Sequence, residues 1–155
     1  MSSVEQRLQE IGLALPEVAL PVGSYVPAKA DGRRIHTSGQ LPLVNGSLPI
    51  TGKVGAEVSV EQAQELARTC VLNAIAAVKS VVGDLDQVQS VVKVVGFVAS
   101  DPTFTQQPAV INGASDLLAQ AFGDIGVHAR SAVGVAVLPM DAPVEVEIVV
   151  ALREE

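Results

Sequence analysis

The C-terminal part of the chain constrains the fold most, because two β-strand patterns there carry charges among small and apolar residues. Read with the two-residue period of a strand, residues 129–137 place Arg130 on a face of alanine and glycine, with valines packing on the other face. Residues 144–152 place Glu145 and Glu147 opposite a stripe of valine, isoleucine and leucine. If the intervening turn closes an antiparallel hairpin, Arg130 and the two glutamates share one face of the sheet.

Arg130 and Glu145 cannot touch within such a hairpin. They are about six residues apart along the strands, which is on the order of 20 Å at roughly 3.3 Å per residue. Two interpretations stay open. Either the two charges have unrelated roles, or Arg130 of one subunit lies near Glu145 of another.

Helical periodicity predicts three helices in the rest of the chain. Apolar residues recur at helical spacing over residues 60–82 and about 109–122, and Ser59 is the predicted N-cap of the first of these two long helices. A short amphipathic helix is predicted over about 3–13, with Ser3 in the capping position.

Strand patterns separate these helices. Residues 88–99 are apolar on both faces, as expected of a central strand. Extended segments over 18–28 and 34–38 flank an Asp31-Gly32 turn and predict a hairpin. The order β-β-α-β-α-β-β indicates an α+β fold in which two long helices cover one face of a sheet. The small residues on the other face, Ala132 and Gly134 among them, favour cover by the sheet of another copy.

Composition limits the classes of partner. A chain of 155 residues is most simply a single domain over 1–155, and 48% hydrophobic residues against 17% charged residues favour oligomerisation. The formal net charge of −7 disfavours phosphate binding, so no nucleic-acid partner is expected.

Few residues are available for metal or disulfide chemistry. Cys70 is the single cysteine, and His36 and His128 are the two histidines, so neither a disulfide framework nor a metal centre is expected. No signal peptide and no apolar run of about 18 residues is present, so we expect a cytoplasmic protein with no membrane partner.

A series of motifs in fixed order spans residues 18–152. The motifs are Tyr25 after Gly23-Ser24, Thr37-Ser38-Gly39-Gln40-Leu41-Pro42, Asn73, Asn112-Gly113, Ala129-Arg130-Ser131-Ala132-Val133, Leu138-Pro139 and Val144-Glu145-Val146-Glu147. With these motifs the chain resembles the RidA/YjgF family, also labelled endoribonuclease L-PSP-like, of the enamine/imine deaminase superfamily.

The resemblance implies a chorismate-mutase-like fold, a mixed sheet with two long helices on one face, and a homotrimer with a cleft at each subunit interface. It implies that Arg130 grips a substrate carboxylate and that Glu145 positions the hydrolytic water. It implies no cofactor. The residues that it places around the ligand are Tyr25, Ser38, Gly39, Gln40, Asn112 and the backbone of Ala132.

Two positions depart from the pattern of that family. The usual cysteine two residues after the arginine is Ala132 here, so a thiol contact is absent. A position that is often acidic is Gly134, which we expect to widen the floor of the pocket.

Three functions follow from the resemblance, in order of preference. The first is hydrolytic deamination of small enamines or 2-imino acids to 2-keto acids and ammonia. The second is a noncatalytic protein that binds or senses a small carboxylate such as a 2-keto acid. The third is an endoribonuclease, which the acidic charge disfavours. Without the resemblance, Arg130 is equally well explained by an interface salt bridge to Glu145 or Glu147, and His128 is expected in an exposed loop.

Overall fold

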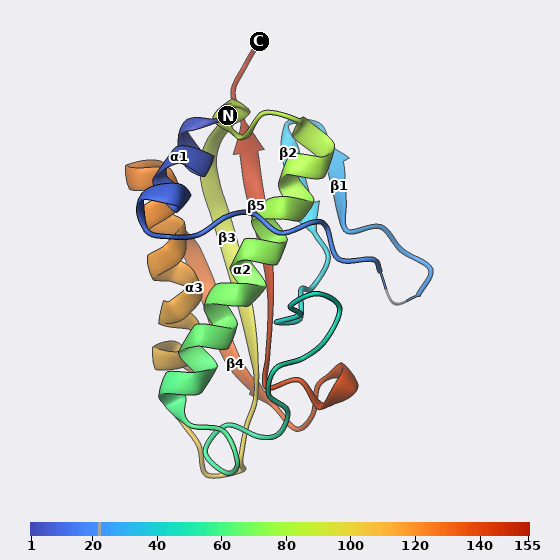
Figure 1. The fold of residues 1–155 in the computed structure, drawn as a ribbon, viewed down its shortest axis with the longest axis vertical. Helices are drawn as coiled ribbons and strands as arrows, with labels where there is room; N and C mark the ends of the chain where they lie inside the picture. The colour runs from blue at the N-terminus through green and yellow to red at the C-terminus, as the bar shows by residue number, and fades with distance from the viewer. Residues whose placement is uncertain (22) are drawn as a thin grey trace.

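The predicted order of elements is confirmed in the computed structural model, which describes residues 1–21 and 23–155 (Figure 1). The five strands form one mixed sheet in the order β1-β2-β5-β3-β4, in which only β3 and β4 are parallel. The strands are β1 (Ala28–Asp31), β2 (Arg34–Thr37), β3 (Val88–Ala99), β4 (Ala129–Val135) and β5 (Val144–Leu152).

The two long helices lie on the same face of this sheet, as predicted (Figure 1). They are α2 (Val60–Val82) and α3 (Gln107–Phe122). The described residues also form the short 3₁₀ turns η1 (Leu85–Gln87), η2 (Gly123–Gly126) and η3 (Pro139–Asp141). Ser59 is the N-cap of α2, as predicted, and it forms a capping box with Gln62. The core between helices and sheet is built from fully buried aliphatic side chains such as Ile75, Ile111, Leu117, Leu118 and Ile148.

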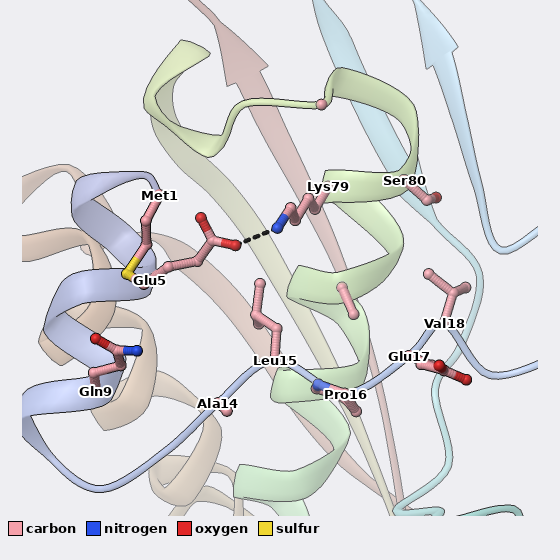
Figure 2. Close-up of a pocket in the computed structure, with 12 residues that line it drawn as sticks. Met1, Glu5, Gln9, Ala14, Leu15, Pro16, Glu17, Val18, Lys79 and Ser80 are labelled. Atoms are coloured by element: carbon pink, nitrogen blue, oxygen red, sulfur yellow. Dashed lines mark hydrogen bonds and ion pairs between the residues drawn. The ribbon is translucent and has the colours of Figure 1, made fainter.

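The short N-terminal helix, α1 (Ser3–Glu10), differs from the prediction at both ends. Its N-cap is Ser2 rather than Ser3, because Ser2 and Glu5 form the reciprocal capping box. It ends at Glu10 rather than near residue 13, because Gly12 adopts a left-handed φ of 80°. α1 packs against α3, and its Glu5 forms an ion pair with Lys79 of α2 (Figure 2).

The predicted strand over 18–28 is also shorter in the structure. β1 begins only at Ala28, and residue 22 lies outside the described residues. The predicted hairpin at Asp31-Gly32 is confirmed, since β1 and β2 pair antiparallel from Ala28 opposite Thr37 to Asp31 opposite Arg34.

The predicted hairpin between the last two strands is wrong. β3 lies between β4 and β5, parallel to the first and antiparallel to the second. The physical reason is that β3 is apolar on both faces and occupies a central position, with partners on both edges. The β3-α3-β4 segment is therefore a parallel crossover unit, and the turn before β5 carries the chain past the end of β3.

The predicted common face for Arg130 and the glutamates is wrong for the same reason. Arg130 is opposite Val94, which is opposite the buried Ile148, so Arg130 lies on the face that α2 and α3 cover. Glu145 is opposite Phe97, three positions further along β3 than Val94; because three is an odd number, Glu145 lies on the other face. We call this other face the open face; it carries Val95, Phe97, Ser131, Val133, Glu145, Glu147 and Val149.

The small residues of β4 are explained by the helix above them. A Cβ on Gly96 of β3 would lie 2.4 Å from Ile111 Cδ1 of α3, so α3 lies almost directly on the strands. Ala132 is opposite Gly96 and packs against this core. The prediction that Ala132 and Gly134 face another sheet is therefore wrong, because they are small to admit α3, while the larger Val133 is 44% exposed on the open face.

Candidate functional site

The predicted site residues fall into two groups, and the first gathers around Glu145. Backbone hydrogen bonds join Gln40 to Val146 of β5 in both directions, at 2.8 and 3.0 Å, so the Ser38-Gly39-Gln40 segment runs beside β5. A Cβ on Gly39 would lie only 2.8 Å from Cδ and Oε2 of Glu145. The absence of a side chain at Gly39 therefore lets the Glu145 carboxylate lie directly against the backbone. We call Tyr25, Ser38, Gly39, Gln40 and Glu145 the acidic half-site.

The other residues of the acidic half-site shape its wall. The Ser38 hydroxyl donates a 2.6 Å hydrogen bond to the Val26 carbonyl, and the Gln40 side chain donates to the Ser38 carbonyl at 3.3 Å. The Ser38 hydroxyl is thus engaged with the backbone of its own subunit. Tyr25, 47% exposed, lines a small cavity of about 30 Å³ together with Gly39 and Gln40. The structure therefore brings Tyr25 beside the Gly39 and Gln40 segment that contacts Glu145.

Glu145 has the electrostatic setting of a proton-transfer group. Burial raises the pKa of its carboxyl above the ordinary value, and the neighbouring Glu147 carboxylate raises that pKa further. Cys70 lies beneath it in α2, where burial and then the charge of Glu145 raise the pKa of the thiol. A fully buried thiol with a raised pKa is unreactive, so Cys70 is a core residue.

The second group surrounds Arg130 at the junction of β4 and α3. Arg130 Nη1 donates to the Ser115 hydroxyl at 3.1 Å, and Nη2 donates to the Pro108 carbonyl at 3.1 Å. Asn112 is exposed one helical turn after Pro108 and therefore lies on the same side of α3. Ala132, two residues after Arg130, lies on the same face of β4. We call Pro108, Asn112, Ser115, Arg130 and Ala132 the basic half-site.

The two half-sites do not meet within one chain. Arg130 and Glu145 are separated by three register positions and by the whole of β3. With strands about 4.8 Å apart and about 3.3 Å per residue, their Cα atoms are roughly 14 Å apart. Their side chains leave opposite faces of the sheet, so one small molecule cannot contact both in the same chain.

Comparison with known proteins decides the family. The pattern of the YjgF/chorismate mutase-like, putative endoribonuclease family matches residues 5–152. The chain belongs to this family. Protein TCP17 of Trypanosoma cruzi is 45% identical, over 97% of this chain and 94% of that protein.

Solved structures of the YjgF family agree. Atu1372 of Agrobacterium tumefaciens, a protein of unknown function, is 45% identical over 97% of this chain and 93% of its own, with a TM-score of 0.91. A more distant structure is that of E. coli TdcF with bound serine, 28% identical over 90% of this chain and 94% of its own, with a TM-score of 0.60. The predicted family and its fold, a mixed sheet with two long helices on one face, are thus confirmed.

The lack of a side chain at Gly134 was predicted to widen the floor of the pocket, and this prediction is wrong. A Cβ on Gly134 would lie 2.7 Å from Nε2 of Gln107, at the start of α3. That amide also donates to the Phe104 carbonyl at 2.9 Å and to the Ser100 hydroxyl at 3.3 Å. The space above Gly134 is filled by Gln107, so the glycine admits a side chain from α3.

A further cavity lies away from both half-sites. It measures about 560 Å³ and lies between α1, residues 14–18 and the end of α2 (Figure 2). Two of its charged residues, Glu5 and Lys79, already pair with each other. The Lys79 ammonium and the Ser2 hydrogen bonds lower the pKa of Glu5 to about 2. It contains none of the predicted site residues, so we do not assign the function to it.

Metal and membrane features are absent from the described part of the chain. Within residues 1–21 and 23–155, no three side chains of histidine, cysteine, aspartate or glutamate gather at one point that suits a metal ion. No helix in these ranges is long and apolar enough to cross a bilayer.

Sequence reasoning missed two residues next to Arg130. His128, predicted in an exposed loop, is partly buried: its Nε2 lies 2.9 Å from the Ser115 hydroxyl and its Nδ1 lies 2.6 Å from the Gly126 carbonyl. Ser115 sits on α3 three residues after Asn112, on the side that faces β4. The sequence offered one signal for Ser115, its position on the same side of the helix as Asn112. That signal indicates a contact with Arg130 only when α3 is known to pack on β4.

Proposed function

We propose that this protein hydrolyses small enamines and 2-imino acids to 2-keto acids and ammonia, without a cofactor, at clefts formed between copies of the chain. Membership of the YjgF family supports this proposal, as does the serine bound to TdcF, since serine carries the carboxylate that a 2-imino acid also carries. The assembly that we propose is the homotrimer implied by the resemblance.

One observation carries the proposal. Each chain holds a carboxyl group with a raised pKa on the open face, and a guanidinium on the other face that cannot reach it. A raised carboxyl pKa suits general acid–base catalysis, and a guanidinium presents a planar fork to a carboxylate. A second copy packed on the open face is the simplest way to place Arg130 beside the Glu145 of its neighbour.

The chemistry follows from these two groups. Arg130 binds the substrate carboxylate and holds the adjacent C=N carbon toward Glu145 of the neighbouring chain. Glu145 accepts a proton from water while the water oxygen bonds to that carbon, and it passes this proton to the imine nitrogen. In the resulting carbinolamine, Glu145 transfers the hydroxyl proton to the amino nitrogen, and the C–N bond breaks to release ammonia and leave the 2-keto acid. For an enamine, protonation of the β-carbon by the Glu145 carboxylic acid first produces the imine.

Activity measurements on single variants test the catalytic roles. An amino acid oxidase generates the imine, and semicarbazide traps what remains, so the loss of trapped imine reports hydrolysis. We expect Arg130→Ala and Glu145→Gln each to lower the rate about 100-fold or more, because each removes a group used in the reaction. The matched control is Arg33→Ala, since the Arg33 guanidinium forms an ion pair with the exposed Glu154. If neither single variant slows hydrolysis, the proposal is wrong.

Mixing the two inactive variants tests the division of the site. In a ring of mixed subunits, a site works only when its arginine comes from the Glu145→Gln chain and its glutamate from the Arg130→Ala chain. Random assembly of equal amounts then restores about a quarter of wild-type activity. A site within one chain restores none. If the wild type is inactive but binds pyruvate through Arg130, the protein is a binding protein for small carboxylates instead.

A further inference from the structure

A directed chain of hydrogen bonds ends on Arg130. His128 Nδ1 is 2.6 Å from the Gly126 carbonyl, His128 Nε2 is 2.9 Å from the Ser115 hydroxyl, and that hydroxyl accepts from Arg130 Nη1 at 3.1 Å. The residues come from three elements: α3, the segment between η2 and β4, and β4 itself. The chain of bonds therefore ties the strand that carries Arg130 to the helix above it.

The chemistry of the groups fixes the direction of these bonds. A carbonyl oxygen only accepts, so the hydrogen of a neutral His128 ring must be on Nδ1, and Nε2 is left as an acceptor. The Ser115 hydroxyl must then donate to Nε2, which leaves its lone pairs for the Arg130 guanidinium. Donors thus run from Arg130 to Ser115, from Ser115 to His128, and from His128 to Gly126.

The far end of this chain is rigid. A Cβ on Gly126 would lie 2.3 Å from the Leu118 carbonyl oxygen and 3.1 Å from Phe122 Cβ, so Gly126 packs directly on the last turns of α3. Gly126 is buried, and its carbonyl is a fixed acceptor for His128. The orientation of the imidazole, and through it the hydroxyl of Ser115, is set by the packing of α3.

We propose that Ser115 and His128 are positioning residues that hold the Arg130 guanidinium in one orientation for a carboxylate. This inference rests on the proposed function of Arg130. The Ser115 bond and the Pro108 bond engage one N–H on each terminal nitrogen and so fix the guanidinium plane. A guanidinium has five N–H groups, so the remaining ones, the Nε–H among them, are available to a carboxylate. A preoriented fork loses less side-chain freedom when the ligand binds.

The consequence for kinetics differs from that of a catalytic residue. The carboxylate is held in the ground state and in the transition state alike, so loss of preorientation weakens both equally and raises KM with little change in kcat. A charged hydrogen bond of this kind corresponds to roughly a tenfold change. We therefore expect Ser115→Ala to raise KM for the imine, and Kd for pyruvate, by about tenfold.

Two variants of serine provide the test and its control. Ser115→Thr keeps the hydroxyl, so we expect it to retain pyruvate affinity within about threefold of wild type. Ser80→Ala removes a comparable helical hydroxyl, which donates to the Ala77 carbonyl at 2.7 Å, and is expected to leave both constants unchanged. Thermal unfolding of each variant followed by circular dichroism confirms that it is folded before the constants are compared.

Nitrogen NMR of labelled histidine tests the hydrogen-bond chain from Arg130 through Ser115 and His128 to Gly126, which we call the relay, and it does so without any turnover. At a pH where the rings are neutral, we expect His128 to carry its hydrogen on Nδ1, and His36→Gln separates the two histidine signals. A neutral His128 with its hydrogen on Nε2 overturns the relay, and so does unchanged pyruvate affinity in Ser115→Ala. If the wild type binds pyruvate but hydrolyses no imine, the deaminase proposal fails. The pyruvate affinity of the Ser115 variants and the tautomer of His128 still test the relay in that case. A wild type that neither binds pyruvate nor hydrolyses the imine overturns both proposals.

Discussion

Adding a single methyl group at Gly39 should disable the proposed site while leaving the fold intact. Gly39 has no left-handed φ, so alanine fits its backbone. The new Cβ would lie 2.8 Å from Cδ and Oε2 of Glu145, and 3.1 Å from Cγ. The Glu145 carboxylate must therefore move.

The size of the movement follows from the distances. Ordinary contacts begin near 3.4 Å, so the carboxylate has to withdraw by about 0.6 Å from its position 2.8 Å away. A misplacement of about 1 Å in a catalytic group costs roughly 100-fold in rate, so we expect kcat to fall by about 10- to 100-fold. Glu145 is only partly buried and its carboxylate is the end of a flexible side chain, so the loss of unfolding free energy should stay below about 1 kcal/mol.

Imine hydrolysis and urea unfolding measure the two effects separately. The matched control is Gly134→Ala, whose Cβ would meet the flexible Gln107 amide at 2.7 Å, a similar overlap at a distance from Glu145. The control should keep kcat within about twofold. A second control places Gly39→Ala in the Glu145→Ala background, where its small stability cost should vanish because nothing remains to displace. Wild-type turnover by Gly39→Ala would refute the contact as a determinant of the reaction.

Two further predictions use the pKa values of the glutamates. Glu147→Gln removes the charge that raises the Glu145 pKa, so the acidic limb of the hydrolysis rate should move to lower pH; a limb that stays in place, or moves up, contradicts Glu145 as the base. Glu5 has its pKa lowered from 4.5 to about 2, so its stabilising contribution is present above about pH 4.5 and is lost as the pH falls toward 2. Because Lys79 is 42% exposed, we expect Glu5→Gln to cost only about 1–2 kcal/mol of unfolding free energy at pH 7 and almost nothing near pH 2, as measured by urea unfolding at both pH values.

The sequence was sufficient to place the two long helices because their signals are local. α2 extends over the predicted residues from Val60 to Val82, where a long apolar stripe is bounded by the Ser59 cap and the Gly83 stop. The order of the strands in the sheet could not be predicted from local signals in the same way. Strands that are consecutive in the sequence usually pair, but β3 lies between β4 and β5 in the sheet. Neither the sequence of β4 nor that of β5 indicates that β3 separates them.

The prediction of which β4 side chains face the core was wrong for a second physical reason. The rule that larger apolar residues face the core assigned Val133 to the buried side. The covering helix lies so close that alanine and glycine are the residues that fit beneath it, so Ala132 faces α3. A stripe of small residues therefore indicates close helix packing as well as close sheet packing, and periodicity alone does not separate the two.

The same reversal changes which surfaces the proposed assembly has to bring together. Had Arg130 and Glu145 shared a face, one surface of a single chain would have presented both groups, on the order of 20 Å apart. Their placement on opposite faces makes each chain present an arginine at one edge and a glutamate on the open face. In the proposed assembly, each chain then contributes to two different sites, one through each group. Any substitution that loosens the contact between copies consequently removes activity in proportion to the fraction of chains that separate, even when every folded chain keeps both half-sites intact.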